Sequence, residues 1–212
     1  MSNKAGKFIT FEGIDGSGKS SQISFLQDYL LQNYNIKSII TREPGGCYLS
    51  EKLRNIIINE KMDSITELLL LFAARNEHIQ TKILPNLNNG IWVLSDRYID
   101  ASYAYQNGGR NLAEHKITEL VKFINAPIPD ITFLFDVDIN IAKQRIIKRN
   151  EKLDKFEAEN QNFHLQVKNN YLQQANKIEN KNRIFVLDSQ QNMQEISQQI
   201  ITIIQQKFLE VN

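Results

Sequence analysis

Few residues of this sequence could bind a metal through sulfur or close a disulfide. The only cysteine is Cys47, and the three histidines, His78, His115 and His164, lie far apart in the chain. One cysteine excludes an internal disulfide, and no spacing among these residues is that of a zinc site. We therefore expect the histidines to be ordinary surface or helix residues.

Long apolar runs and an excess of charge of one sign are missing as well. The longest uniform run, Leu68–Leu71, is far shorter than the stretch of about 18 apolar residues that suggests a membrane span. The 25 basic and 24 acidic residues nearly cancel, which gives no indication of a nucleic-acid surface. Residues 1–7 have no apolar stretch, so no signal peptide is expected. We expect a cytoplasmic protein with neither a membrane nor a nucleic-acid partner.

What the chain does contain is a regular alternation of short apolar runs and amphipathic stretches. Its 212 residues are enough for one domain, residues 1–212, with a full hydrophobic core. Strands are predicted at residues 8–11, 36–41, 91–95, 131–135 and 184–187. Helices are predicted at residues 19–33, 49–59, 66–88, 112–125, 139–150, 158–180 and 192–209. This order predicts an α/β fold with a five-stranded parallel sheet and helices on both faces.

A phosphate-binding loop is predicted directly after the first strand, at Gly13, Ile14, Asp15, Gly16, Ser17, Gly18, Lys19 and Ser20. The order is G-x-x-x-x-G-K-[ST], in which glycines let successive backbone N–H groups point at phosphate oxygens. Lys19 would reach the β- and γ-phosphates of a nucleotide, and the Ser20 hydroxyl would bind Mg²⁺. A plain glycine-rich turn does not require Lys and Ser at these offsets. The chain is therefore expected to bind a nucleoside triphosphate with Mg²⁺.

Charged residues follow the second and third strands, where the ligands of parallel α/β sheets bind. Arg42 and Glu43 precede the turn Pro44–Gly46, and Asp96 and Arg97 close the third strand. An acid at the end of a strand commonly holds Mg²⁺ in enzymes with a phosphate-binding loop. Asp136 also closes a strand, but we prefer Asp96 as the metal ligand because Arg97 beside it could hold a phosphoryl group.

Four segments together resemble the thymidylate kinase (dTMP kinase) family. They are Phe11–Ser20, Thr41–Gly46, Asp96–Gln106 and Leu153–Glu157. The segment at 96–106 is the most specific, since many families share the phosphate-binding loop. The resemblance covers nearly the whole chain and implies a three-layer nucleoside monophosphate kinase fold, a short lid at about residues 148–158, and a homodimer.

The resemblance implies that arginines bind the phosphate of the acceptor nucleotide, dTMP. Arg42, Arg75 and Arg97 would clamp it, because a guanidinium fork matches phosphate oxygens, and Arg54 would join them. Glu43 is expected close by, and the Glu43–Pro44 peptide bond is predicted to be cis.

The same resemblance assigns residues to the nucleoside part of dTMP. Phe72 would stack on thymine, and Ser102 and Gln106 would read the edge of the base. Tyr105 would pack on the sugar and crowd a ribose 2′-OH, and Asp15 would face the 3′-OH. In many relatives the stacking aromatic lies four residues before the arginine, whereas Phe72 lies three before Arg75 and Leu71 occupies the usual position.

The source of catalytic positive charge also departs from part of the family. Some members carry an Arg inside the phosphate-binding loop, but residues 14–17 include no basic side chain. The chain therefore resembles the subgroup whose lid supplies this charge, here through Arg145, Arg149 and Lys155. We expect Arg149 to contribute most, because Lys155 is a point charge that cannot bind phosphate in a bidentate manner.

The predicted reaction is transfer of the γ-phosphoryl group of ATP to dTMP, with Lys19, Arg97 and the lid residues as catalytic groups. The acceptor phosphate oxygen is already ionised, so no general base is needed. Another nucleoside or deoxynucleoside monophosphate kinase of this fold is the nearest alternative. A GTP-dependent switch would need an N-K-x-D element, which the sequence does not contain. A nucleotide-binding module without chemistry would be expected to lack Lys19, Asp96 or Arg97.

Overall fold

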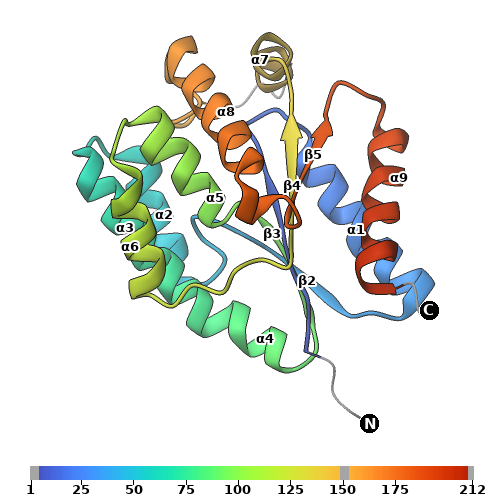
Figure 1. Ribbon diagram of the computed structural model, residues 1–212. Helices are drawn as coiled ribbons and strands as arrows, with labels where there is room; N and C mark the ends of the chain where they lie inside the picture. Colours follow the sequence, from blue (N-terminus) through green and yellow to red (C-terminus); the bar gives the residue numbers. More distant parts are fainter. Residues whose placement is uncertain (1–4, 149–152, 210–212) are drawn as a thin grey trace.

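A parallel β-sheet forms the centre of the molecule, with helices on both faces (Figure 1). This computed structural model describes residues 5–148 and 153–209. In the described part the strand order is β2-β3-β1-β4-β5, which confirms the predicted five-stranded parallel sheet. The strands are β1 (Phe8–Glu12), β2 (Ser38–Arg42), β3 (Trp92–Asp96), β4 (Ile131–Asp136) and β5 (Ile184–Asp188).

Each strand runs one residue beyond its predicted apolar run and ends on a charged residue. β2 also begins two residues later than predicted, at Ser38. Register places Asp96 opposite both Arg42 and Phe11, and Asp136 opposite Asp188. The carboxyl edge of the sheet therefore carries a row of charged side chains above an apolar core.

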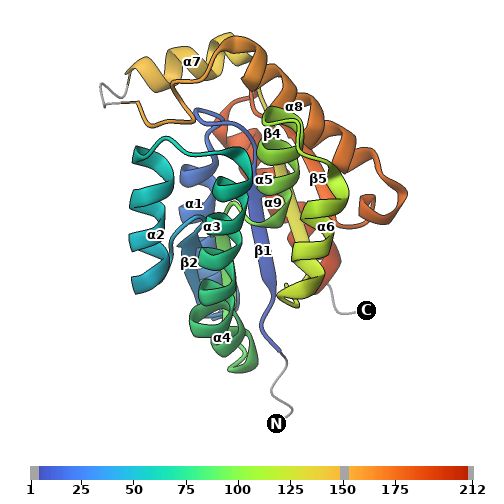
Figure 2. The ribbon, with the colours of Figure 1, turned by 90° about the vertical axis from the view of Figure 1, so that its left-hand side faces the viewer.

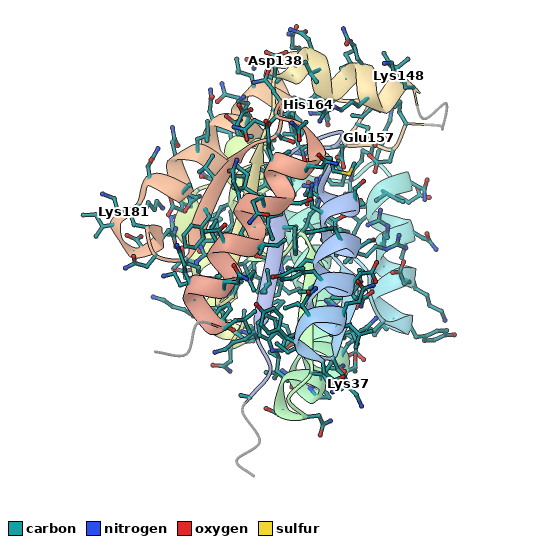
Figure 3. All side chains as sticks on the ribbon, turned by 90° about the vertical axis from the view of Figure 1, so that its right-hand side faces the viewer. Lys37, Asp138, Lys148, Glu157, His164 and Lys181 are labelled. Atoms are coloured by element: carbon teal, nitrogen blue, oxygen red, sulfur yellow. The ribbon has the colours of Figure 1, made fainter. Side chains whose placement is uncertain are left out.

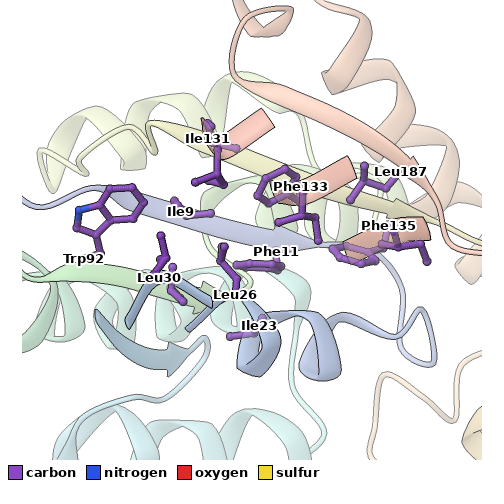
Figure 4. Packing of buried hydrophobic residues seen from close by; sticks show 14 residues of the cluster. Ile9, Phe11, Ile23, Leu26, Leu30, Trp92, Ile131, Phe133, Phe135 and Leu187 are labelled. Carbon is purple, nitrogen blue, oxygen red and sulfur yellow. The ribbon is translucent and has the colours of Figure 1, made fainter. Parts of the chain in front are cut away.

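One face of the sheet is covered by two helices, seen at the right of Figure 1. They are α1 (Lys19–Tyr34) and α9 (Met193–Ile204), which continues as the π-helical turn η4 (Gln205–Leu209). Residues two apart in a strand share a face, so Phe11, Phe133 and Phe135 all point toward these helices. Figure 4 shows them packed against Leu26 and Leu30 of α1, both fully buried.

Most of the other helices lie on the opposite side, and Figure 2 shows α3, α5, α6 and α8 in front of the strands. These helices, with the short turns between them, are α2 (Tyr48–Asn59), α3 (Ser64–His78), η1 (Ile79–Ile83), α4 (Leu84–Asn88), α5 (Ile99–Ser102), η2 (Tyr103–Gly109), α6 (Glu114–Phe123), α8 (Gln161–Asn176) and η3 (Ile178–Asn180). α7 (Ile139–Lys148) crosses the carboxyl end of the sheet. No helix of the described residues is long and apolar enough to cross a membrane.

Two helical segments differ from the prediction. The single helix expected at residues 66–88 is interrupted by the π-helical turn η1, which lies just before Pro85. Residues 99–109, for which no helix was predicted, form α5 and the π-helical turn η2. Gly108 and Gly109 let η2 approach α8, since a Cβ at Gly108 would lie 2.6 Å from the Cβ of Asn170.

Candidate active site

The loop between β1 and α1 has the conformation that its glycines permit. Gly13 and Gly16 have φ values of 133° and 78°, which favour glycine. A Cβ at Gly13 would lie 2.6 Å from the carbonyl oxygen of Phe135, and one at Gly16 would overlap the carbonyl of Ala142. The loop therefore sits tightly between β4 and α7, and α1 starts from Gly18 with no side-chain cap on its first amides. Such amides can receive an anion.

Lys19 lies inside this loop. Its Nζ donates hydrogen bonds to the carbonyl oxygens of Gly13 and Ile14, both at 3.1 Å, and to Ser17 Oγ at 3.3 Å. Burial, together with the charge of Arg97, lowers the pKa of Lys19 from its ordinary value. Because loop carbonyls alone do not neutralise an ammonium, a phosphate group would satisfy this charge better.

Arg97 joins the loop to the rest of the site. Its φ of 69° lies in the left-handed region, and its guanidinium donates to Gly13 O at 2.9 Å and to Asp15 Oδ1 at 2.8 Å. The guanidinium also lies over the Tyr105 ring, 4.9 Å from its centroid. Burial acts to lower the pKa of Arg97, but Asp15 together with Tyr105, Tyr171 and Asp96 outweighs it, and the pKa is raised well above its ordinary value. Arg97 is therefore a fixed cation.

Glu12, which ends β1, fixes the backbone after Arg97. The side chain is fully buried; Oε1 accepts from the Tyr98 amide and Oε2 from the Tyr171 hydroxyl, both at 2.7 Å. Burial and the nearby Asp100 raise the pKa of Glu12 to about 7, against the lowering effect of Arg97 and the two hydrogen bonds. Tyr171 brings α8 into the same network.

A cleft, named here the outer cleft, lies beside the start of α1 and the end of β3. Its walls include Ser20, Arg42, Glu51, Lys82 and Asp96. Asp96 Oδ1 is buried without a hydrogen-bond partner among the described residues. An orphaned carboxylate oxygen and a serine hydroxyl are hard ligands of the kind that Mg²⁺ takes together with phosphate and water oxygens. The described residues contain no cluster of three His, Cys, Asp or Glu that could hold a metal by itself.

Arg42 is placed in this outer cleft and not with the other predicted phosphate-binding arginines. Glu51, one helix later, accepts from Arg42 Nε at 3.2 Å and Nη2 at 2.9 Å. This bidentate pair turns Arg42 toward α2. The expected clamp of Arg42, Arg75 and Arg97 around one cavity is therefore not assembled in this structure.

A second cavity, named here the inner cavity, lies behind Arg97. Seven side chains predicted from the sequence lie in its wall together with Glu43, the residue expected close by: Asp15, Arg54, Arg75, Arg97, Ser102, Tyr105 and Gln106. The wall also contains Pro44, Ile58, Tyr98, Ala101, Asp154 and Phe156. No individual binding role was predicted for these residues, although all but Ile58 lie in the segments that resemble the family. The Glu43–Pro44 bond is cis, as predicted, and Arg54 Nη1 donates to the Pro44 carbonyl at 2.8 Å.

Buried partners hold Arg75 in place. Its Nε donates to Glu43 Oε2 at 2.6 Å, its Nη1 to Ser102 Oγ at 2.9 Å, and its Nη2 to the Tyr98 carbonyl at 3.0 Å. Glu43 Oε1 lies 3.0 Å from Nδ1 of His78, a histidine with no exposed surface. The guanidinium is therefore oriented before any ligand binds.

The structure corrects the expectation for Phe72. α3 begins at the N-cap Asp63, whose side chain accepts from the Ile65 amide. One helical turn separates Leu71 and Arg75, which both face the inner cavity, while Phe72 is rotated by about 100° from Leu71. Phe72 is 2 % exposed and packs in the core beneath Arg75, 4.7 Å from its guanidinium carbon. Leu71 is the α3 side chain that could contact a base here.

Tyr105 and Gln106 approach the inner cavity from η2. The Tyr105 hydroxyl donates to Asp15 Oδ2 at 3.5 Å, a long contact, while its ring packs edge-on against Phe156. Gln106 Nε2 donates to Glu67 Oε1 at 3.0 Å. These contacts link the phosphate-binding loop, η2 and the segment after residue 152.

The two predicted lid residues that the structure describes have different environments. Arg145 donates to the Gly16 carbonyl at 3.2 Å and the Ser189 carbonyl at 3.1 Å, so it fastens α7 to the loop. Lys155 points toward α3, where its Nζ lies 2.9 Å from Glu67 Oε2. Arg149 lies outside the described residues. Figure 3 shows Lys148 and Glu157 on either side of this gap, at the end of the molecule opposite Lys37.

Several buried polar residues of the site gave little signal in the sequence. Glu67 could have been noticed, because it lies at i, i+4, i+8 spacing with Leu71 and Arg75 on an otherwise apolar helix. Glu12 is a carboxylate at the end of an apolar strand directly before the loop. His78 and Tyr171 have no such pattern and become visible only in the fold.

Comparison with known proteins points to one family. The family model described as thymidylate kinase matches residues 11–200. A thymidylate kinase of Ruthia magnifica is 47% identical over 204 residues, which cover 94% of this chain and 98% of that protein. One from Janthinobacterium is 44% identical, covering 94% and 96%. The solved structure of thymidylate kinase from Ehrlichia chaffeensis superposes with a TM-score of 0.76 and 32% identity, covering 95% of this chain and 99% of that one.

Proposed function

The chain belongs to the thymidylate kinase family, and from that premise we propose how its residues share the transfer of a phosphoryl group from ATP to dTMP. The protein is an ATP:dTMP phosphotransferase that forms dTDP and ADP. The observation that carries our division of roles is the Asp15–Arg97 pair. Asp15 belongs to the phosphate-binding loop, Arg97 closes β3, and both line the inner cavity.

We assign ATP to residues 13–20 and dTMP to the inner cavity. An ionised oxygen of the dTMP phosphate attacks the γ-phosphorus, a new P–O bond forms, and the bond from that phosphorus to the bridging β-oxygen breaks. Arg97 and Lys19 face the charge that spreads over the transferred group, and no proton has to be removed from the nucleophile.

Mg²⁺ would be held by Ser20 and Asp96 in the outer cleft. This assignment is supported by the orphaned Asp96 Oδ1 and by the oxygen chemistry of both side chains. When bound, the ion would neutralise charge on the β- and γ-phosphates. Arg42 and Lys82 line the same cleft and add positive charge at its outer wall.

At the nucleoside, we propose that Ser102 and Gln106 read the base and that Leu71 packs against it. Tyr105 takes the sugar side and opposes a 2′-OH, with Asp15 facing the 3′-OH. Arg54 and Arg75 supply the positive wall around the phosphate and the base. Support comes from the shared cavity wall of these side chains.

For the lid, at about residues 148–158 of a single domain 1–212, we propose that Arg149 supplies most of the charge on the transferred phosphoryl group. Lys155 pairs with Glu67, and Arg145 donates to two carbonyl groups. Among the three predicted lid cations, this favours Arg149 for the role at the phosphoryl group. Arginine fingers are worth roughly 10³–10⁵ in rate, and a partly redundant one belongs at or below the low end. Arg149→Ala should therefore lower kcat far more than Lys155→Ala, and equal effects would reject this ranking.

A homodimer in the cytoplasm is also proposed. α3 exposes Ile65 and Leu69, 46% and 53% exposed and one turn apart, and Phe123 at the end of α6 is 81% exposed. Sedimentation should give twice the chain mass, and Leu69→Glu should shift it toward the monomer. A monomer at micromolar concentration would contradict the proposal.

A coupled assay of ADP release tests the function directly. We expect release that depends on dTMP and Mg²⁺ and is much weaker with dCMP, dGMP or thymidine. Similar kcat/KM values for dTMP and dGMP would instead indicate a general monophosphate kinase. Release that depends on thymidine but not dTMP would indicate a nucleoside kinase.

A further inference from the structure

Glu67 is a buried carboxylate that touches both the base-reading residue and the lid. It lies on α3 with 2 % of its surface exposed. Oε1 accepts from Gln106 Nε2 at 3.0 Å and Arg110 Nε at 3.2 Å. Oε2 accepts from Arg110 Nη2 at 3.3 Å and lies 2.9 Å from Lys155 Nζ. One carboxylate therefore contacts donors from η2 (Gln106), from Arg110 directly after η2, and from the lid (Lys155).

This contact decides which way the Gln106 amide faces. An ionised carboxylate only accepts hydrogen bonds, so the NH₂ group of Gln106 must point at Glu67. Although burial acts to raise the pKa of Glu67, its hydrogen bonds from Lys155, Gln106 and Arg110 outweigh this, and the pKa is lowered. The carboxylate thus stays ionised at neutral pH, and Gln106, which lines the inner cavity, is left to offer its carbonyl oxygen there.

A carbonyl oxygen at the edge of a base selects for an N–H group. Thymine carries such a donor at N3, whereas the N3 of cytosine is an acceptor and would oppose the oxygen lone pairs. A site built to hydrogen-bond a ligand group discriminates strongly when that group is missing, because its own polar atom is left unpaired.

The lid is tied to the same carboxylate. Asp154 and Phe156 line the inner cavity, while Lys155 between them points away to Glu67. The Lys155 amide also donates to the Ile58 carbonyl of α2 at 3.4 Å. Arg110 lies over Phe156, 5.6 Å from the ring centroid, and pairs with Glu159.

We propose that Glu67 is a positioning residue that sets base specificity by fixing the Gln106 carbonyl toward the base. Through Lys155, it also anchors the neighbouring wall residues Asp154 and Phe156. This deepens the proposed function and rests on it, since Gln106 must read the base of the acceptor. The residue itself touches neither substrate nor metal.

The test is Glu67→Gln, which keeps the shape of the side chain. Lys155 Nζ and Arg110 Nη2 both contact Oε2 and should hold the new amide oxygen at that position. The NH₂ group then takes the Oε1 position, where it faces Gln106 and the Nε–H of Arg110. The Gln106 amide must then turn and present NH₂ to the base. We expect the ratio of kcat/KM for dTMP to that for dCMP to fall by about 10- to 100-fold, the range expected when one buried polar group is left without its hydrogen-bond partner.

Two further variants separate positioning from a structural role. In a Gln106→Leu background, Glu67→Gln should leave the ratio unchanged, because no amide remains to be turned. Glu77→Gln on the same helix makes the same charge change away from the inner cavity. In the wild-type background it should leave the dTMP-to-dCMP ratio unchanged. If Glu67→Gln does not fold, Glu67→Asp is the second variant. It keeps the negative charge beside Arg110 and Lys155, but its shorter side chain moves the carboxylate away from Gln106. This variant should also lower the dTMP-to-dCMP ratio.

A folded Glu67→Gln or Glu67→Asp protein with the wild-type ratio would overturn the inference. The inference would also be overturned if Glu67→Gln lowered the dTMP-to-dCMP ratio equally in the wild-type and the Gln106→Leu backgrounds. A wild-type protein that does not phosphorylate dTMP would instead refute the proposed function, so the two failures are distinguishable.

Discussion

The inner cavity and the outer cleft are built in opposite ways. Around the inner cavity, the buried carboxylates of Glu43, in its wall, and Glu67, behind Gln106, are each held by two or more donors. In the outer cleft Arg42 is 55% exposed, and Asp96 Oδ1 has no partner among the described residues. We infer that the proposed acceptor half is preorganised by the fold, whereas the proposed metal and nucleotide half is completed by what binds there.

This difference follows from what each half recognises. A neutral base edge offers few interactions, so its readers must be oriented in advance to discriminate. A triphosphate with Mg²⁺ carries enough charge to organise exposed side chains as it binds. Substitutions should accordingly affect stability in one half and mainly turnover in the other.

The largest effect is expected from Lys19→Met. The variant removes the positive charge that is proposed to face the transferred phosphoryl group, so kcat should fall on the order of 10²- to 10³-fold. Since Lys19 is a desolvated cation resting on carbonyl groups, thermal unfolding should occur at the same or a higher temperature. A clear loss of stability would show that the loop needs this charge to fold.

Arg75→Met and Arg42→Met test the contrast between the halves directly. Arg75→Met leaves Glu43 with only its histidine contact and should cost about 3–5 kcal/mol of unfolding free energy. It should also raise KM for dTMP about 10- to 100-fold. Arg42→Met removes an exposed pair and should cost at most about 1 kcal/mol. Equal stability losses in denaturant titrations would refute the distinction.

A smaller effect is expected at the sugar. Tyr105 is wedged between Arg97, Phe156 and Phe163, which fixes its ring at the cavity wall. Tyr105→Ala opens this wall and should reduce the preference for deoxyribose over ribose by about tenfold, comparable to one methylene group in a hydrophobic pocket. Tyr105→Phe keeps the ring and should retain the preference. The measurement is kcat/KM with the deoxyribo and ribo forms of thymidine monophosphate.

The last test concerns pH and Glu12, which lies between the two halves. Its pKa is about 7 in the folded protein against 4.5 ordinarily, so the folded state binds more protons between these values. The contribution of Glu12 to stability is therefore complete below about pH 4.5 and is lost as the pH rises through 7. Relative to Glu12→Gln, the melting temperature of the native protein should fall between about pH 5 and pH 8. Parallel curves would contradict the raised pKa.

The sequence predicted the sheet and the phosphate-binding loop because both depend on local patterns. Apolar runs such as residues 131–135 gave the strands, and the spacing of Gly13, Gly18 and Lys19 gave the loop. Most residues implied by the family resemblance also meet in one cavity. Their individual roles in binding stay predictions.

What the sequence did not predict depends on contacts between distant residues. Phe72 and Leu71 are both apolar, and the packing of α3, which buries Phe72 in the core, decides that Leu71 faces the cavity. Arg42 was drawn away by Glu51, an exposed pairing that the order of the residues does not reveal. The partners of Glu67 span residues 106–155, beyond any local pattern.

The π-helical turn η2 affects how this protein can be aligned with its relatives. Ser102 and Gln106 both reach the inner cavity across a segment wound more widely than an α-helix. Deleting one residue between them would turn the following side chains by roughly a quarter of a turn and move Gln106 off the cavity. A relative with one residue fewer here would present a neighbouring position to the base. Alignments should therefore place a gap in this segment by the geometry of η2, and base-reading residues should be compared only after that gap is placed.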